Sequence, residues 1–381
     1  MAVKKWATTN GTVWSFNGSI VTSIVDSENP QGIPPSTIRL KFSDPTYNPT
    51  TQSFDSNLVW TQVSSSPNIW DAWYGPISSE FKVSWAGFFY NKFTDHTNTV
   101  EVVGANFRGI HNVSQLFEKC SSLLRVGNID FGDAIVAQGM FAYCSNLRTV
   151  GDIVILGSPI YDQGGYVTYS VNVYQMFQNC NSLTTVGNIR IDYASSLESM
   201  FDSCGSLTTV GTIYAPEVLN IRNLFDFCNS LTSVQSITLS DTASIFDSAF
   251  FGCQSLVSCP IVSSMDNAVD CNSTFYNCKA MTSFPVFSGS QITDITNMFW
   301  GCLSLTGTIP SYDFRNVDKC GRAFSGCRNI SGGALATYNR FMSYEIQPTQ
   351  YENCFKDCGI DTQTGVLELS QIPTSWGGTM S

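Results

Sequence analysis

Apolar residues recur along this chain with a period near 24 residues, and each period is built around one short motif. A phenylalanine precedes a cysteine by three residues, and in nine of ten copies Leu, Met or Ile follows the cysteine by three. Seven of the nine intervals between motif cysteines are 24 or 25 residues. Self-similarity at such a period is typical of solenoids, in which each coil buries its apolar positions against its neighbours. The pattern therefore predicts a solenoid of about ten coils over residues 105–360.

Within one coil, the apolar positions predict a helical part followed by a strand. Counted from the motif cysteine, apolar side chains stand at positions −7, −4, −3, 0 and +3, which is helical spacing. Each coil should carry a short helix or helical turn ending near the cysteine. The next segment, such as residues 184–191, is rich in β-branched residues and predicts one short strand. The predicted structural core is Phe117, Cys120, Phe141, Cys144, Phe177, Cys180, Phe201, Cys204, Phe225, Cys228, Phe250, Cys253, Phe275, Cys278, Phe299, Cys302, Phe324, Cys327, Phe355 and Cys358.

The region before the repeats has a different pattern. Six of the eight tryptophans lie in the first 100 residues, among short strand-like stretches separated by Pro, Asn and Ser. We expect an N-terminal arm over residues 1–35, a small all-β docking domain over 36–104, the solenoid over 105–360 and a C-terminal cap over 361–381. The tryptophans suit either a buried core or a sugar-stacking platform, and a core is the commoner use.

Composition and charge exclude several classes of function. Charged residues make up 13% of the chain and the net charge is −11, of which −1 falls in residues 1–100 and −10 in the remainder. Nucleic acid is therefore not an expected partner, because phosphate neutralisation needs clustered Lys and Arg. No apolar run approaches the ~18 residues that a membrane span requires, so no membrane insertion is expected. The first residues also lack the apolar stretch of a secretory signal.

Fourteen cysteines raise the question of disulfides or zinc, and their register answers it. The four outside the motif, Cys259, Cys271, Cys320 and Cys354, all fall in apolar columns of the repeat. Every cysteine is thus predicted to be a small buried hydrophobe with a free thiol. We expect no metal, and folding in a reducing compartment.

Two repeats carry the clearest likeness to a known family. Residues 200–213, Met-Phe-Asp-Ser-Cys-Gly-Ser-Leu-Thr-Thr-Val-Gly-Thr-Ile, and residues 298–310, Met-Phe-Trp-Gly-Cys-Leu-Ser-Leu-Thr-Gly-Thr-Ile-Pro, resemble the BspA-like leucine-rich repeats. The resemblance covers about two thirds of the chain. It implies a leucine-rich-repeat solenoid used for surface adhesion and partner binding in bacteria and their phages, with no catalytic residues to transfer. The copies at Cys327 and Cys358 depart from the pattern, as end repeats do.

Little in the sequence supports catalysis. Only two histidines occur, and no nucleotide-binding or zinc-protease motif is present, so no cofactor is expected. Asp202 and Asp226 share one phase in successive coils and could form a carboxylate pair for glycoside cleavage. Other coils place Glu, Ala, Gln, Phe, Tyr, Trp, Ser and Lys at that phase, which is the variety of a solvated face.

One insertion interrupts the period. Between Cys144 and Cys180 the interval is 36 residues, and the excess carries Tyr161, Tyr166 and Tyr169 among glycines. Tyrosines on a Gly-rich projection are typical of recognition loops, so these three are the predicted binding residues. A β-hairpin that merely packs on the solenoid is the alternative.

These features favour a non-enzymatic phage virion surface protein, a fibre, tail or head-surface component. The N-terminal region would contact other virion proteins, and the solenoid would bind a host surface protein or glycan. Assembly would take place in the host cytoplasm, with homo-oligomerisation left open. A cellular BspA-like adhesin at the bacterial surface and a glycan-cleaving solenoid enzyme are the alternatives.

Overall fold

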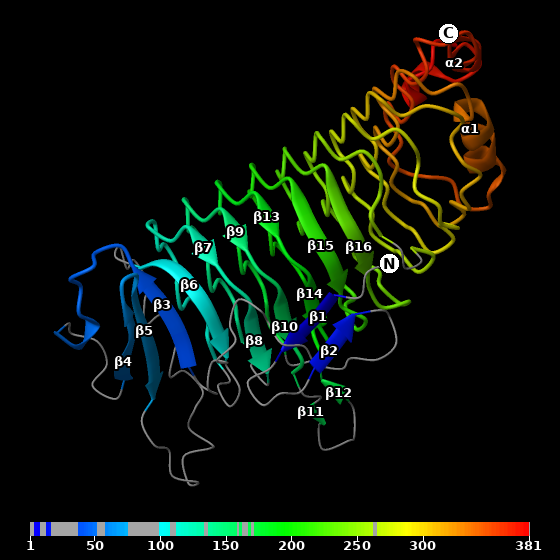
Figure 1. Cartoon of the computed structure of the whole chain (residues 1–381). Helices are drawn as coiled ribbons and strands as arrows, with labels where there is room; N and C mark the ends of the chain where they lie inside the picture. Colours follow the sequence, from blue (N-terminus) through cyan, green and yellow to red (C-terminus); the bar gives the residue numbers. More distant parts are fainter. Residues whose placement is uncertain are drawn as a thin grey trace.

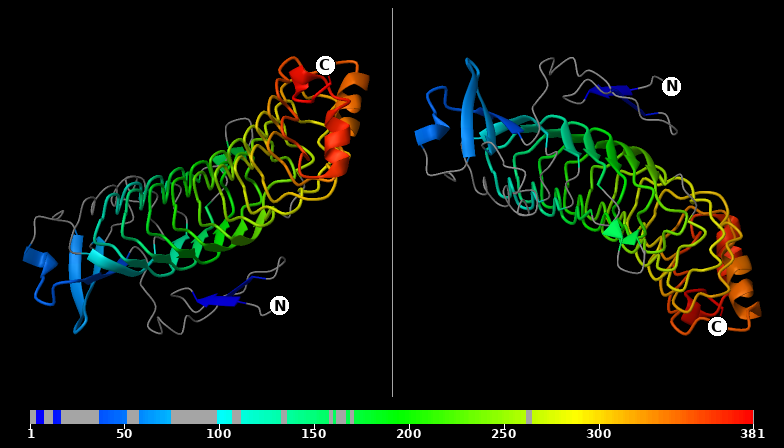
Figure 2. Two further views of the ribbon diagram at one scale, coloured as in Figure 1. Left: turned by 90° about the horizontal axis from the view of Figure 1, so that it is seen from above. Right: turned by 90° about the horizontal axis from the view of Figure 1, so that it is seen from below.

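The protein is an elongated β-solenoid, with antiparallel strands at one end and two short helices at the other (Figure 1). The computed structural model describes residues 4–7, 13–16, 37–51, 58–74, 99–106, 112–132, 136–157, 160–161, 167–168, 171–261 and 265–380. Successive coils stack along one gently curved axis (Figure 2). The predicted solenoid is therefore confirmed.

The regular elements are short and lie mainly in the first half of the chain. The strands are β1 (Lys4–Ala7), β2 (Val13–Phe16), β3 (Thr37–Phe42), β4 (Leu58–Ser65), β5 (Asn68–Tyr74), β6 (Thr99–Asn106), β7 (Arg125–Val126), β8 (Ile129–Gly132), β9 (Thr149–Val150), β10 (Ile153–Ile155), β11 (Ile160–Tyr161), β12 (Val167–Thr168), β13 (Thr185–Val186), β14 (Ile189–Ile191), β15 (Thr209–Tyr214) and β16 (Ser233–Thr238). The helices are α1 (Ala334–Ser343) and α2 (Gln363–Leu369), with 3-10 turns η1 (Pro49–Thr51) and η3 (Thr374–Trp376).

One sheet runs from the N-terminal strands into the solenoid. Strands β4, β5, β3 and β6 pair antiparallel, and β6 then pairs in parallel with β7 and β8 of the first coil. The predicted domain boundary at residue 104 falls inside β6, so the N-terminal strands of 37–106 are not a separate sheet. The physical reason is that the first coil would otherwise leave a row of backbone donors and acceptors unpaired, and β6 covers that edge.

Glycine recurs on the strands because a side chain from the neighbouring coil takes its space. At Gly211, an added Cβ would lie 2.6 Å from Asn188 Oδ1 and 2.7 Å from the Gly187 carbonyl oxygen. Asn188 Oδ1 in turn accepts a hydrogen bond from the Thr212 amide at 3.0 Å. The amide side chain thus links two coils across the position that glycine keeps open.

The short helix or helical turn predicted for each coil is not confirmed. In each coil, the segment before the cysteine is a run of tight turns, with left-handed residues at positions −5 and −1, such as Ser199 (φ 56°) and Ser203 (φ 61°). Met200 bonds within its coil, to the Leu197 carbonyl at 3.2 Å, whereas Phe201 donates to the Leu224 carbonyl of the next coil at 3.0 Å. An α-helix would use all its amides internally. Tandem turns bury the same i, i+3, i+4, i+7 positions and leave alternate amides to join the coils.

The phenylalanine and cysteine columns form the interior. All ten motif phenylalanines and all ten motif cysteines are fully buried. Neighbouring rings stack, as Phe177 and Phe201 do at 5.4 Å between centroids and 4° between planes. In eight coils the thiol lies 3.0–3.2 Å from the phenylalanine carbonyl oxygen of the preceding coil and donates to it. All 14 cysteines are free.

The C-terminal residues close the phenylalanine column. The amide of Phe355, the last motif aromatic, donates to the Trp376 carbonyl at 2.9 Å, in the way that each coil bonds to the next. The Trp376 ring stacks on Tyr351 with 4.5 Å between centroids. Helices α1 and α2 lie at this end (Figure 2). Trp376 therefore supplies an aromatic end to the column where the repeats stop.

Two N-terminal tryptophans contribute to the core rather than to a platform. Trp70 is 8% exposed, and its indole nitrogen donates to Asn68 Oδ1 at 2.7 Å. Trp60 packs against the same core, 6.2 Å from Phe42 between ring centroids. The remaining N-terminal tryptophan side chains, and most of the predicted arm over 1–35, lie outside the described residues.

Candidate functional site

The turns before the cysteines form one long surface, which we call the turn face. It consists of the outward side chains at positions −8, −6, −2 and −1 of each coil. Backbone hydrogen bonds between coils hold these positions in register, as a ladder of parallel bridges from Ser196 through Asn220 and Ile245 to Asp270 and Asp294 shows. Neighbouring coils thus display the same position at the interval set by the stacked rings below, 5.3–5.7 Å. Side chains at one position therefore lie in contact along the axis.

Four aromatic side chains stack on this face and form what we call the aromatic ladder. It consists of Phe227, Phe251, Tyr276 and Trp300, one from each of four successive coils. Phe251 and Tyr276 are parallel at 4.3 Å between centroids, and Tyr276 and Trp300 lie at 4.6 Å. Phe227 meets Phe251 edge-on at 5.1 Å and is 49% exposed. The other three rings are partly exposed. Four adjoining aromatics at a surface provide a large, rigid contact area.

Two carboxylates continue the column of the ladder. Asp202 and Asp226 occupy position −2 in the two coils before Phe251, and Asp226 directly precedes Phe227. Asp202 accepts hydrogen bonds from Gln178 Nε2 at 2.7 Å and from Ser203 Oγ at 2.8 Å. Asp226 is partly exposed, but its Oδ1 atom is buried and has no hydrogen-bond partner among the residues that the structure describes.

The setting of Asp226 favours its protonated form. Burial first, and then the neighbouring carboxylates Asp202 and Asp247, raise the pKa of this carboxyl to about 7. A single carboxyl on the turn face therefore changes charge near neutral pH. Its ionised form is the one that a cationic group would stabilise.

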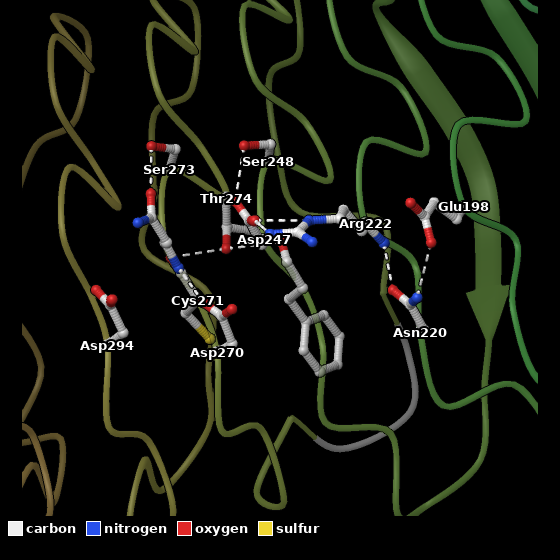
Figure 3. Close-up of polar contacts among 12 residues, drawn as sticks. Glu198, Asn220, Arg222, Asp247, Ser248, Asp270, Cys271, Ser273, Thr274 and Asp294 are labelled. Carbon is white, nitrogen blue, oxygen red and sulfur yellow. Dashed lines mark hydrogen bonds and ion pairs between the residues drawn. The ribbon is translucent and has the colours of Figure 1, made fainter.

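A polar row occupies positions −8 and −6 of the same turn segments (Figure 3). Arg222 reaches from its coil to Asp247 of the next, with Nε 2.8 Å from Oδ2. Ser248 Oγ donates to Asp247 Oδ1 at 2.8 Å, and Asn220 Nδ2 donates to Glu198 Oε2 at 3.2 Å. Each polar group thus bonds across or along the coils, so the row is ordered.

The row becomes more acidic toward the C-terminus. Burial raises the pKa of Asp270, and the carboxylates Asp247 and Asp294 act in the same direction. The Asn272 amide donates to Asp270 Oδ1 at 3.1 Å, while Lys319 Nζ lies 3.3 Å from Asp294 Oδ2. Figure 3 shows Asp247, Asp270 and Asp294 following one another along the coils.

The structure describes some of the residues that the sequence predicts for a site, and others lie outside the described part of the chain. Tyr161 lies in β11, which pairs antiparallel with β12 so that Tyr161 faces Val167 in the register. The insertion therefore contains an antiparallel strand pair. Tyr166, Tyr169 and the Tyr161 side chain lie outside the described residues, so binding by the three tyrosines stays a prediction. Asp202 and Asp226 do stand in adjacent coils, as the Ser203 amide bond to the Asp226 carbonyl at 2.7 Å shows.

Sequence reasoning missed the aromatic ladder. Position −2 carries Phe251, Tyr276 and Trp300 in three successive coils, yet the polar residues at this position in other coils predict a solvated face. The pattern that indicates the ladder is the succession of three aromatic residues at the same position in neighbouring coils, and not the average composition of that position over all coils.

The remaining candidates for chemistry in the described chain are its cysteine thiols and its possible metal ligands. Burial raises the pKa of Cys259 to about 11 and that of Cys327 to about 12, so these thiols stay protonated and are poor nucleophiles. In the described part of the chain, no three His, Cys, Asp or Glu side chains are grouped closely enough to hold a metal ion. None of the helices there is long and apolar enough to cross a membrane.

Fold and surface together define a class, a β-solenoid repeat protein with a stacked aromatic and acidic face. The chain belongs to the family described as "Mycoplasma protein of unknown function, DUF285", which matches residues 87–210 and 196–338. No curated protein matches the sequence.

Proposed function

We propose that the protein is a non-enzymatic recognition protein of the BspA-like leucine-rich-repeat type, which binds a partner through its turn face. The observation that carries this proposal is the aromatic ladder with its flanking carboxylates. The rings stack on one another between coils and still leave aromatic surface exposed, and exposed aromatic patches commonly serve as binding sites. Because the coils are hydrogen-bonded to one another, the surface is already ordered before a partner arrives, which lowers the entropic cost of binding.

The setting that fits this role is the surface of a phage particle. Fourteen free cysteines suit folding in a reducing cytoplasm, and a rigid solenoid suits a component exposed only on the released particle. In this proposal the strands β3–β6 contact other virion proteins and the turn face contacts the host. The hairpin β11–β12 with Tyr161 would be a second contact site.

Two measurements test the role and the setting. Labelled protein should bind intact host cells, and replacing Phe251 and Trp300 together by Ser should reduce that binding at least about tenfold, or 1.4 kcal/mol. A matched double change at exposed Thr232 and Thr282, away from the turn face, should leave binding intact. Equal binding by all three proteins would refute the role. Immunogold labelling of released particles tests the setting, and label found only on cell envelopes would favour a cellular adhesin.

A glycan-cleaving enzyme is the second candidate, and one observation favours it. A carboxyl with its pKa raised to about 7 beside a second carboxylate is the arrangement that glycosidases use for acid and base. Under this alternative, Asp226 would protonate the leaving oxygen, and Asp202 would be the second carboxylate, acting as nucleophile or as the base that activates water. Release of reducing ends from host polysaccharide, abolished by Asp226→Asn, would support it. We prefer recognition because binding of a partner accounts for the exposed aromatic ladder, whereas a catalytic carboxyl pair does not.

A further inference from the structure

The aromatic ladder adjoins a carboxyl group, Asp226, that pairs with no cation among the described residues. Asp226 and Phe227 are adjacent in the chain, and the exposed edge of the ladder at Phe227 lies beside the partly exposed Asp226. Ion pairs occupy the neighbouring row, where Arg222 pairs with Asp247. No described cation pairs with Asp226. Its Oδ1 atom is buried without a described hydrogen-bond partner, so a cation from outside would approach the exposed part of the carboxyl.

The charges around the ladder are strongly unbalanced. The five turn segments 196–203, 220–227, 245–252, 270–277 and 294–301 hold six carboxyl groups and one cation, Arg222, or a formal charge of −5. The carboxyl groups are Glu198, Asp202, Asp226, Asp247, Asp270 and Asp294. A face that is both aromatic and anionic is complementary to a partner that is both planar or apolar and cationic.

The pair Arg222–Asp247 shows which cation this face accommodates. The guanidinium extends along the solenoid axis from one coil to the next, and both its Nε and an Nη bond to the same Asp247 oxygen. A guanidinium presents a planar fork to a carboxylate and stacks on aromatic rings, which an ammonium does less well. Among the described residues no ion pair involves Asp226, whose partly exposed carboxyl adjoins the exposed ring of Phe227.

We propose that the aromatic ladder and its carboxylates bind an arginine-bearing segment of a partner protein, with one guanidinium held between Asp226 and the exposed ring of Phe227. The inference rests on the proposed recognition function and names the chemistry of the partner. A further arginine of the segment would lie along Asp270, since Asp294 is already paired with Lys319. Apolar stems of the arginine side chains would pack along the ring edges of Phe251, Tyr276 and Trp300.

The test uses a hexa-arginine peptide as the probe and the full chain as the receptor. Titration calorimetry at about 0.15 M salt limits contributions from distant charges, because the Debye length is then about 8 Å. Phe227→Ala and Asp226→Asn should each weaken binding at least about tenfold. Phe227→Tyr should retain binding, since it keeps the ring. Hexa-lysine should bind several-fold more weakly than hexa-arginine.

Two control variants match these changes at the same repeat positions. Tyr143 occupies position −1 three coils earlier, with a left-handed φ of 62° against 54° for Phe227 and 46% exposure. Glu118 occupies position −2 of the first coil, where the next coil places Ala142. Tyr143→Ala and Glu118→Gln should leave hexa-arginine binding unchanged. Circular dichroism of each variant establishes that it is folded.

The pH dependence of hexa-arginine binding tests the role of Asp226 directly, because a purely structural role of this residue would not change it. Carboxylates Asp202 and Asp247 face Asp226, and Arg222 lies beyond them on Asp247. Because the guanidinium needs the ionised carboxylate, binding should strengthen between pH 6 and pH 8 and release protons. Asp226→Asn should flatten this dependence.

Several outcomes would overturn the proposal. Equal weakening by the control variants would mean that the peptide binds the net charge of the chain and not the ladder. Binding of a glucosamine hexamer that needs Phe227, without hexa-arginine binding, would assign the ladder to a glycan. If Phe227→Ala lost host-cell binding but kept hexa-arginine binding, the recognition function would stand and the arginine proposal would fall. If no turn-face variant altered cell binding while the peptide results held, the recognition function would fall instead.

Discussion

The two sides of the solenoid share a backbone period but use their side chains differently. On the sheet side, hydroxyls bond from coil to coil, as Thr184 Oγ1 does to the Arg148 carbonyl and Thr208 Oγ1 does to the Thr184 carbonyl, both at 2.8 Å. On the turn side, backbone bonds join every pair of coils, while side-chain bonds such as Arg222–Asp247 occur only between some of them, and the side chains at position −2 range from carboxylates to indole. The sheet side therefore repeats its residues because they hold the coils together. The turn side can vary, and variation is what recognition of a particular partner requires.

The largest expected effect comes from the interior that both sides share. Phe225→Ala removes a fully buried ring that stacks on Phe201 and Phe250, and should lower the free energy of unfolding by about 3–5 kcal/mol. Urea denaturation followed by circular dichroism measures it. A loss below about 1 kcal/mol would show that neighbouring coils collapse into the space, which would contradict a rigid column.

Glycines that a neighbouring coil encloses on the sheet side should not tolerate even an added methyl group. Gly211→Ala places a Cβ against Asn188 Oδ1 and the Gly187 carbonyl and should cost about 1–3 kcal/mol. The control is Gly205→Ala, where the nearest atom to a new Cβ is the Phe227 carbonyl oxygen at 3.9 Å. That change should lie within about 0.5 kcal/mol of wild type. Similar urea midpoints for both variants would show that the close contacts around Gly211 do not restrict the residue at that position.

The turn side should make stability depend on pH near neutrality. The folded pKa of Asp226 lies above the value of 3.8 that it has in the unfolded chain, so its contribution is fully present below pH 3.8 and is lost as pH rises through about 7. Wild type should lose about 1 kcal/mol between pH 5 and pH 8, a figure reduced for the partial exposure of the carboxyl. Asp226→Asn should remove this loss of stability, whereas the control Asp241→Asn, at an exposed position, should not. Thermal melts across this range decide between them.

The smallest effect is expected where a sheet-side hydroxyl is exposed. Thr232 Oγ1 donates to the Thr208 carbonyl at 2.9 Å, but water can replace this bond when the side chain is removed. Thr232→Ala should therefore change the urea midpoint by an amount equivalent to less than about 0.5 kcal/mol. A larger loss would mean that the hydroxyl ladder, and not the core beneath it, sets the register of the coils.

The sequence by itself determined the architecture and its interior. The period, the phenylalanine and cysteine columns and the free thiols follow from spacing, because a residue at one phase of a solenoid always meets the same phase of its neighbours. The position of Asp202 beside Asp226 follows in the same way. The N-terminal boundary could not be predicted, because β6 pairs with strands on both sides and pairing partners are not encoded in a local pattern.

Tertiary structure alone decided the form of each coil and the character of the turn face. Apolar spacing of i, i+3, i+4, i+7 fits both a helix and a run of tight turns, and the choice depends on whether amides such as that of Phe201 find a partner in the next coil. Likewise, Phe251, Tyr276 and Trp300 form a ladder only because hydrogen-bonded coils bring them to 4.3–4.6 Å. The sequence encodes which residues share a phase, and the packing of coil on coil determines what those residues become together.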